Sequence, residues 1–144
     1  MPSTALLRSI IADLAPPRNA RQPEFAPPRL MRWRAVARMA SQVRGCRSLM
    51  ITADLGRPAD ATRCVREAAS SLGSVDILVH SAGGLVPGRL LELDPQAWYE
   101  GFEVHVHAVF HLCRTAIPRM RAKHEGAIVL ISSAAGMRSF PNNI

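Results

Sequence analysis

Glycine is missing from the first 44 residues of this 144-residue sequence, and the first glycine is Gly45. The first third of the chain has no lysine and few acidic residues. Residues 1–50 carry nine arginines against two acids, whereas residues 51–144 balance nine basic with nine acidic side chains, so the net charge of +7 belongs to the first third. Because much arginine and proline without glycine is not typical of a compact unit, we predict that residues 1–35 are not a native domain.

Cysteine, tyrosine and long apolar runs are also scarce. The three cysteines, Cys46, Cys64 and Cys113, are odd in number and lack metal-ligand spacing. They argue against a disulfide framework and favour a reducing, cytoplasmic location. No apolar run is long enough to cross a bilayer, so we expect no membrane partner.

Alternating strand and helix patterns fill the rest of the chain. Apolar runs at residues 48–54, 75–84 and 126–132 predict buried strands. A helix is predicted from Pro58 to the stop signal at Gly73, with an inner face of Ala61, Val65, Ala68 and Leu72. A longer helix should begin after the N-cap Asp94 and end near Lys123, with an inner face of Trp98, Phe102, Val106, Val109, Cys113 and Ile117.

This order predicts an α/β fold, with a parallel sheet covered on both faces. The first third is harder to interpret, because prolines interrupt residues 16–28. Residues 4–15 and 36–45 could each form a helix, and no part of residues 1–32 has the pattern of a buried strand.

Four segments of residues 36–144 resemble the short-chain dehydrogenase/reductase family, in the family's order. They are TADL, LVHSAGG, the helix from WYEGF to IPRM, and GAIVLISSAAG. The resemblance implies NAD or NADP as the cofactor and a small alcohol or carbonyl compound as the substrate. It puts Ser133 on the catalytic serine and His105 where the family has a catalytic Asn. The implied cofactor-binding residues are Asp54, Leu55, Ser81, Ala82 and Gly83.

Two elements that the family chemistry requires are absent from these residues. The only tyrosine, Tyr99, has Glu103 four positions later instead of a lysine, and the only lysine is Lys123. No glycine-rich turn precedes Gly45 to hold a pyrophosphate. We therefore expect residues 36–144 to be an incomplete, Rossmann-like domain with a partial doubly wound parallel sheet. It would lack the first strands and everything after the serine strand.

The Rossmann strand order adds one expectation, that the strands at 48–54 and 75–84 do not touch, because two others should lie between them. We expect the intact parent to be the oxidoreductase, and a homo-oligomer is possible only for that parent. The alternative is an inactive remnant that acts, if at all, by docking to an intact relative. For residues 1–35 we favour a frame error or decay over a targeting segment, and both over a nucleic-acid arm. His107 and His111 have the i, i+4 spacing of metal ligands, but no other residue extends that spacing, so we expect no metal site at His105, His107 and His111.

Overall fold

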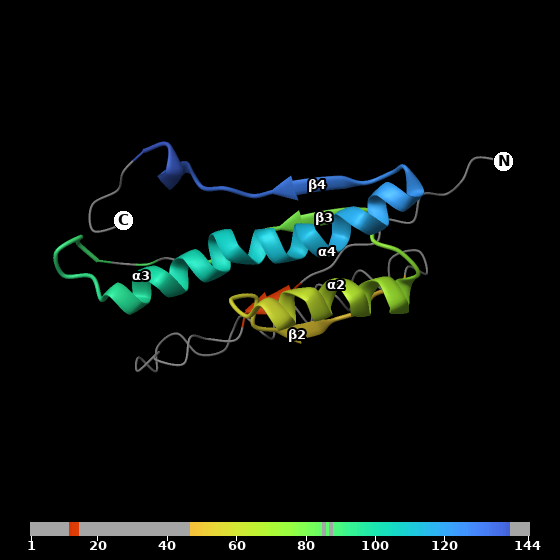
Figure 1. Cartoon of the computed structure of the whole chain (residues 1–144). Coiled ribbons are helices and arrows are strands. Elements are labelled where there is room, and N and C mark those ends of the chain that lie inside the picture. The colour runs from red at the N-terminus through yellow and green to blue at the C-terminus, as the bar shows by residue number, and fades with distance from the viewer. Residues whose placement is uncertain (1–11, 15–46, 85, 87, 139–144) are drawn as a thin grey trace.

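The computed structural model describes residues 12–14, 47–84, 86 and 88–138. In chain order these form β1 (Ala12–Leu14), β2 (Ile51–Ala53), α2 (Pro58–Leu72), β3 (Ile77–His80), α3 (Pro95–Phe102), α4 (Ala108–Lys123) and β4 (Ala127–Leu130). A π-helix, Glu103–His107, joins α3 to α4, and a 3₁₀-helix, Ala134–Gly136, follows β4. Helices α2 and α4 lie side by side against the strands (Figure 1).

The strands form two separate parallel pairs. β1 pairs with β2, from Ala12 opposite Ile51, and β3 pairs with β4, from Ile77 opposite Ala127. β2 and β3 are not paired with each other, which confirms the expectation from the Rossmann order. The α/β class and the partial, Rossmann-like arrangement are also confirmed.

Strand β1 corrects the interpretation of the first third. We predicted no strand before residue 33 and allowed a helix at 4–15, but residues 12–14 are extended and hydrogen-bonded to β2. A three-residue strand is too short to show a period in the sequence, and the backbone groups of β2 need a partner that local pattern does not reveal. The helix considered at 36–45 lies outside the described residues.

Helix α2 forms as its sequence predicts. Pro58 occupies its first turn, and Gly73 ends it with φ of 94°, a left-handed conformation that favours glycine. The predicted inner face is buried, and Cys64 and Ala69 extend it. The guanidinium of Arg47 adds a second constraint on this end of the helix, since its Nη2 donates to the carbonyl oxygen of Leu72 at 3.0 Å.

The long helix starts and ends where predicted, but its inner face is different. The carboxylate of Asp94 accepts from the N–H of Gln96 at 3.0 Å, and α4 ends at Lys123. The buried residues are Ala108, Leu112, Ala116 and Met120, whereas Trp98, Phe102, Val106 and Ile117 of the predicted face are 39–50% exposed. For α4 the π-helix supplies a reason, because its wider turn rotates α4 relative to a stripe counted at 3.6 residues per turn. Trp98 and Phe102 precede the π-helix on α3, where no residue is buried.

Strand β4 is also less buried than its sequence suggests. All four of its residues are exposed, although Ala127–Leu130 reads as a fully buried parallel strand. The prediction that the sheet is covered on both faces is therefore wrong for β4. The core lies between α2, α4, β2 and β3 and contains Leu55, Val65, Val75 and Leu78, each at most 2% exposed. Among the described residues, no helix is both long and apolar enough to cross a bilayer.

Candidate active site

The carboxyl end of β2 leads into a tight turn built around Asp54. The Asp54 carboxylate accepts from the N–H of Gly56 at 3.1 Å, and the Asp54 N–H donates to Oδ2 of Asp60 at 3.0 Å. That backbone hydrogen bond lowers the pKa of Asp60, with a smaller contribution from Arg63. Asp54 is thus half-buried and already engaged, and the Leu55 side chain is a core residue at 2% exposure.

The carboxyl end of β3 carries a buried histidine. His80 is 5% exposed, and no described group forms a hydrogen bond with its Nε2. Burial lowers its pKa below the usual value, and the nearby His105 lowers it further, while a hydrogen bond to the Val104 backbone acts in the opposite direction. The His80 carbonyl oxygen accepts from the N–H of Ile131 at 2.8 Å, which ties the ends of β3 and β4 together.

The turn after β3 is covered by His105 from the π-helix. Nε2 of His105 lies 2.9 Å from the carbonyl oxygen of Gly84 and 3.3 Å from its nitrogen, so it donates to the first or accepts from the second according to its tautomer. The ring also lies against Gly83, where an added Cβ would be 2.1 Å from Cε1 of His105. The structure therefore brings together two of the predicted site residues, Gly83 and His105.

Glu103 links the π-helix to the β2 turn, and sequence reasoning did not identify it. Its Cβ lies 3.5 Å from where a Cβ on Gly56 would be, and its Oε2 is 3.1 Å from Nδ1 of His107. One face of the π-helix thus approaches the ends of both β2 and β3. The contact itself is an ordinary van der Waals distance that a Cβ at position 56 would also allow, so no residue type in the sequence pointed to it.

Ser133 lies beyond β4 and is exposed. Its Oγ accepts from the N–H of Ala135 at 3.2 Å and caps the short 3₁₀-helix, so the hydroxyl proton stays available for another acceptor. Ser81 is exposed at the end of β3, and Ala82 is half-buried against the core. Within the described part of the chain, no hydrogen bond joins Ser133 to His105 or to the turn at residues 81–84.

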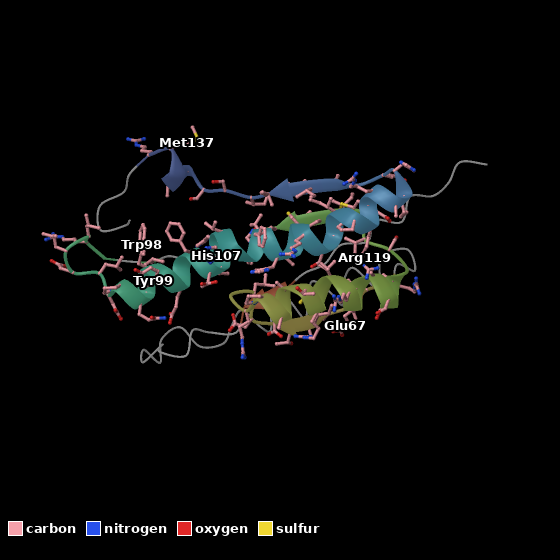
Figure 2. All side chains as sticks on the ribbon, viewed as in Figure 1. Glu67, Trp98, Tyr99, His107, Arg119 and Met137 are labelled. Carbon is pink, nitrogen blue, oxygen red and sulfur yellow. The ribbon has the colours of Figure 1, made fainter. Side chains whose placement is uncertain are left out.

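The single tyrosine and the single lysine lie toward opposite ends of the molecule, and neither forms a described hydrogen bond with Ser133, His105 or the turn at residues 81–84. Tyr99 is 63% exposed on α3, toward the end of the molecule opposite the C-terminus of α4 (Figure 2). Lys123 is the last residue of α4, and its Nζ forms an ion pair with Asp76, just before β3 begins. Because Asp76 precedes the strand, the lysine lies at the edge opposite the Ser133 end. No group of three metal-ligating side chains occurs among the described residues.

Comparison with protein families supplies the decisive observation. The family model of the short chain dehydrogenases matches residues 30–144, which is most of the chain. The chain belongs to this family. The match includes the three strand ends and the π-helix just described.

Individual relatives agree with this assignment. An uncharacterised NAD-dependent oxidoreductase of Mycobacterium tuberculosis is 32% identical over 105 residues, which is 72% of this chain and 38% of the relative. A 3-oxoacyl-[acyl-carrier-protein] reductase of Staphylococcus epidermidis is 27% identical over 69% of this chain and 41% of its own length.

The fold matches a solved structure of the same kind. L-sorbose reductase from Gluconobacter frateurii, complexed with NADPH and L-sorbose, superposes with a TM-score of 0.73 and 29% identity, covering 79% of this chain and 43% of the reductase. The chain thus spans about two fifths of the length of the relatives that it matches.

Proposed function

We propose that this chain is part of an NAD(P)-dependent oxidoreductase, which moves a hydride between the nicotinamide cofactor and a small alcohol or carbonyl compound. The observation that carries the proposal is the gathering of the β2 and β3 ends around the π-helix, with Ser133 beyond the end of β4. In open α/β sheets, ligands bind outside the carboxyl ends of parallel strands. Two of the relatives, an NAD-dependent oxidoreductase and an NADPH-bound sorbose reductase, support the same reaction class.

In this proposal Ser133 orients the reacting oxygen of the substrate. Its Oγ already accepts the Ala135 N–H, and that contact leaves the O–H to donate to a carbonyl or alcoholate oxygen. His105 is a positioning residue, because its Nε2 is engaged by Gly84 and its ring supports the turn that contains Gly83.

The described residues fit a dinucleotide only in part. The ring of His105 occupies the space beside Gly83, where a cofactor would otherwise approach the backbone, and the Asp54 carboxylate is bonded within its own turn. Helix α2 begins with Arg57 as its N-cap and Pro58 in its first turn, so it offers no glycine-rich cradle for a pyrophosphate. Asp54, the Leu55 backbone, Ser81, Ala82 and Gly83 are then proposed as one side of a cofactor cleft.

We further propose that this chain by itself does not turn over substrate. Proton transfer requires a phenol or similar acid within hydrogen-bond reach of the substrate oxygen. Tyr99 points into solvent from α3, and Lys123 is held by Asp76 at the opposite edge. Loss of a general acid/base typically lowers a rate by about 10²–10⁴-fold. Weak cofactor binding lowers the rate further.

The direct test follows the absorbance of NADH and NADPH with the purified chain and a panel of ketones and secondary alcohols. No turnover is expected. Turnover that Ser133→Ala abolishes would show that another residue supplies the proton, and the inactivity proposal would fail while the reaction class survived. Turnover that is unchanged in Ser133→Ala would remove this site from the reaction.

A second test concerns the reaction class itself. The DNA around this chain, read in every frame, is expected to encode a Gly-x-x-x-Gly-x-Gly turn in another frame upstream of codon 36 and a Tyr-x-x-x-Lys pair just downstream of codon 144. Joined in frame with this chain, these segments should yield an enzyme that oxidises or reduces the nicotinamide and loses that activity on Ser133→Ala. A folded, joined protein with no activity on the panel would contradict the proposed reaction class.

The second candidate function is a non-catalytic piece that docks to an intact relative. The exposed residues of β4 favour it, because a neighbouring strand or helix could cover them. Co-expression with an intact relative from the same genome, followed by co-purification, tests it. Leu130→Lys, which adds a charge to β4, should abolish co-purification if the docking is real.

A further inference from the structure

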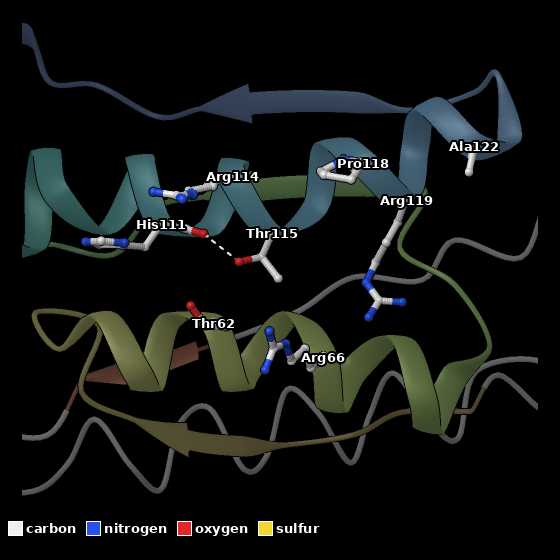
Figure 3. A pocket seen from close by; sticks show the side chains of 8 residues that line it. All are labelled: Thr62, Arg66, His111, Arg114, Thr115, Pro118, Arg119 and Ala122. Atoms are coloured by element: carbon white, nitrogen blue, oxygen red, sulfur yellow. Dashed lines mark hydrogen bonds between the residues drawn. The ribbon is translucent and has the colours of Figure 1, made fainter.

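A groove separates α2 from α4 on the side turned away from the strands (Figure 3). Its volume is about 630 Å³. Three arginines and a histidine line it without any acidic side chain: Arg66 from α2, and His111, Arg114 and Arg119 from α4. The inner faces of the same helices, with Val65 and Leu112, pack into the core. The groove is therefore separate from the strand-end site.

The lining has a matched arrangement on the two helices. Thr62 and Arg66 lie four residues apart on α2, and Thr115 and Arg119 lie four residues apart on α4. Residues at this spacing share one face of a helix, so each helix presents a hydroxyl and a guanidinium to the groove. Both threonines are half-buried and both arginines are exposed. The groove thus has hydroxyl groups at its base and cationic groups at its rim.

The nearby acids do not neutralise these arginines. Asp60 and Glu67 on α2 both pair with Arg63, at 3.3 and 3.2 Å. Arg114 lies over the ring of Phe110, 5.8 Å from its centroid. Arg66 and Arg119 form no ion pair with any described residue. In Figure 3 the Arg119 side chain reaches from α4 toward α2, and Arg66 lies over the face of α2.

Like charges gathered in one groove repel each other unless an anion lies between them. Arginine suits phosphate in particular, because its planar guanidinium donates two parallel hydrogen bonds to two oxygens. Thr115 Oγ1 donates to the carbonyl oxygen of His111 at 2.9 Å, whereas Thr62 forms no hydrogen bond with a described residue and its hydroxyl can donate to an anion.

We propose that the groove between α2 and α4 binds the phosphate groups of a soluble small molecule, with Arg66 and Arg119 holding them from opposite sides. The site lies on the outer surface of the helix layer, and binding there does not require the hydride-transfer reaction. It goes beyond the proposed function and can be tested without measuring turnover.

The test is calorimetric titration of the full chain with inorganic pyrophosphate at constant ionic strength. The altered protein is Arg66→Gln/Arg119→Gln. The charge-matched control is Arg121→Gln/Arg138→Gln, in which both arginines are exposed and neither lines the groove. The loss of two exposed charge contacts predicts roughly 10-fold weaker pyrophosphate binding for the groove variant, which is about 1.4 kcal/mol, and a loss of less than about 2-fold for the control. A tricarboxylate, citrate, is titrated in parallel.

Each outcome decides the proposal. If the groove variant and the control lose the same affinity for pyrophosphate, binding depends only on the net charge of +7 and the proposed site is refuted. Equal affinity for citrate would remove the selectivity for phosphate, and no binding by the unaltered chain would overturn the site. Arg66→Lys/Arg119→Lys keeps the charge and removes the forked geometry, so an intermediate loss is expected. The far-UV circular dichroism spectrum of each variant should match that of the unaltered chain. If Arg66→Gln/Arg119→Gln loses helix, the pyrophosphate affinity of Arg66→Lys/Arg119→Lys is used to decide whether the two guanidinium groups bind the ligand.

Discussion

The open side of β4 should make the isolated chain associate with itself. β4 pairs with β3 along one edge, and no described strand lies along the other. Ile128, Val129, Leu130 and Ile131 remain 37, 43, 52 and 56% exposed. Full burial of such a side chain is worth about 1.5–3 kcal/mol, so each leaves about 1 kcal/mol unrealised and the four together leave about 4 kcal/mol. That is a large fraction of the roughly 5–15 kcal/mol that stabilises a typical domain.

Leu130→Lys is the matching perturbation. Half of the Leu130 side chain is already exposed, so a lysine there can extend its ammonium into water at a folding cost below about 1 kcal/mol. A charge on an edge strand also opposes pairing with another chain. The contrasting control is Leu78→Lys on β3, which is 2% exposed and would bury the ammonium. This control should lose the fold altogether.

Sedimentation velocity over a range of concentrations is the assay, with far-UV circular dichroism to follow helix content. The unaltered chain should sediment as mixed oligomers, and Leu130→Lys should shift it toward monomer with its helix content unchanged. If Leu130→Lys keeps its helices and associates as before, the association uses another surface. A monomeric unaltered chain with a sharp thermal transition would refute the reasoning entirely.

Three further predictions concern the free energy of unfolding, measured by urea denaturation of variants that also carry Leu130→Lys. Gly83→Ala should displace His105 and cost about 1 kcal/mol, with no additional cost when combined with His105→Ala, because both changes remove the same contact. Burial holds the pKa of His80 below its ordinary value of 6.5. The stability that neutral His80 contributes is therefore complete above that pH and is lost as the pH falls through the lower pKa of the folded state. His80→Asn should make the stability less dependent on pH in this range. Ala116→Leu, at a fully buried position, should cost about 1–3 kcal/mol, whereas Ala122→Leu in the exposed groove should change stability by less than about 0.5 kcal/mol.

Local signals predicted most of the secondary structure. The first turn of α2 at Pro58, its left-handed stop at Gly73 and the cap at Asp94 each depend on residues within one helical turn, and the structure contains all three. The buried face of α2 followed from its period alone, because the helix is regular throughout. Parallel pairing and the separation of β2 from β3 followed from the family's strand order.

The errors arose where a contact is set by distant parts of the chain. β1 exists as a partner for β2, and three residues carry no periodic signal. The inner face of α4 could not be counted from Trp98, because five π-helical residues intervene between α3 and α4. β4 has the sequence of a buried strand, but burial needs a covering element, and none of the described elements covers it.

The sequence predicted where the candidate site residues lie in the fold, but it did not predict which groups they contact. Strands that run parallel end at one edge, so Asp54 and Gly83 could be assigned there from sequence alone. The engagement of His105 with Gly84 could not, because it depends on the direction in which the π-helix presents its side chains. The resemblance supplied the position of His105 and left its role open.

Family membership and catalytic competence therefore depend on different residues in this chain. The family match extends over residues 30–144 and reflects strands, helices and glycine turns that the fold itself requires. Competence needs an acid/base beside the substrate oxygen, and a serine hydroxyl such as that of Ser133 does not titrate near neutral pH. The one imidazole near Gly83 is engaged by Gly84, and the one ammonium is held by Asp76 at the opposite edge. Our proposal is that the family fold is present in this chain while the proton relay is not, and the assay with NADH and NADPH, together with the protein joined to its flanking segments, tests the two parts separately.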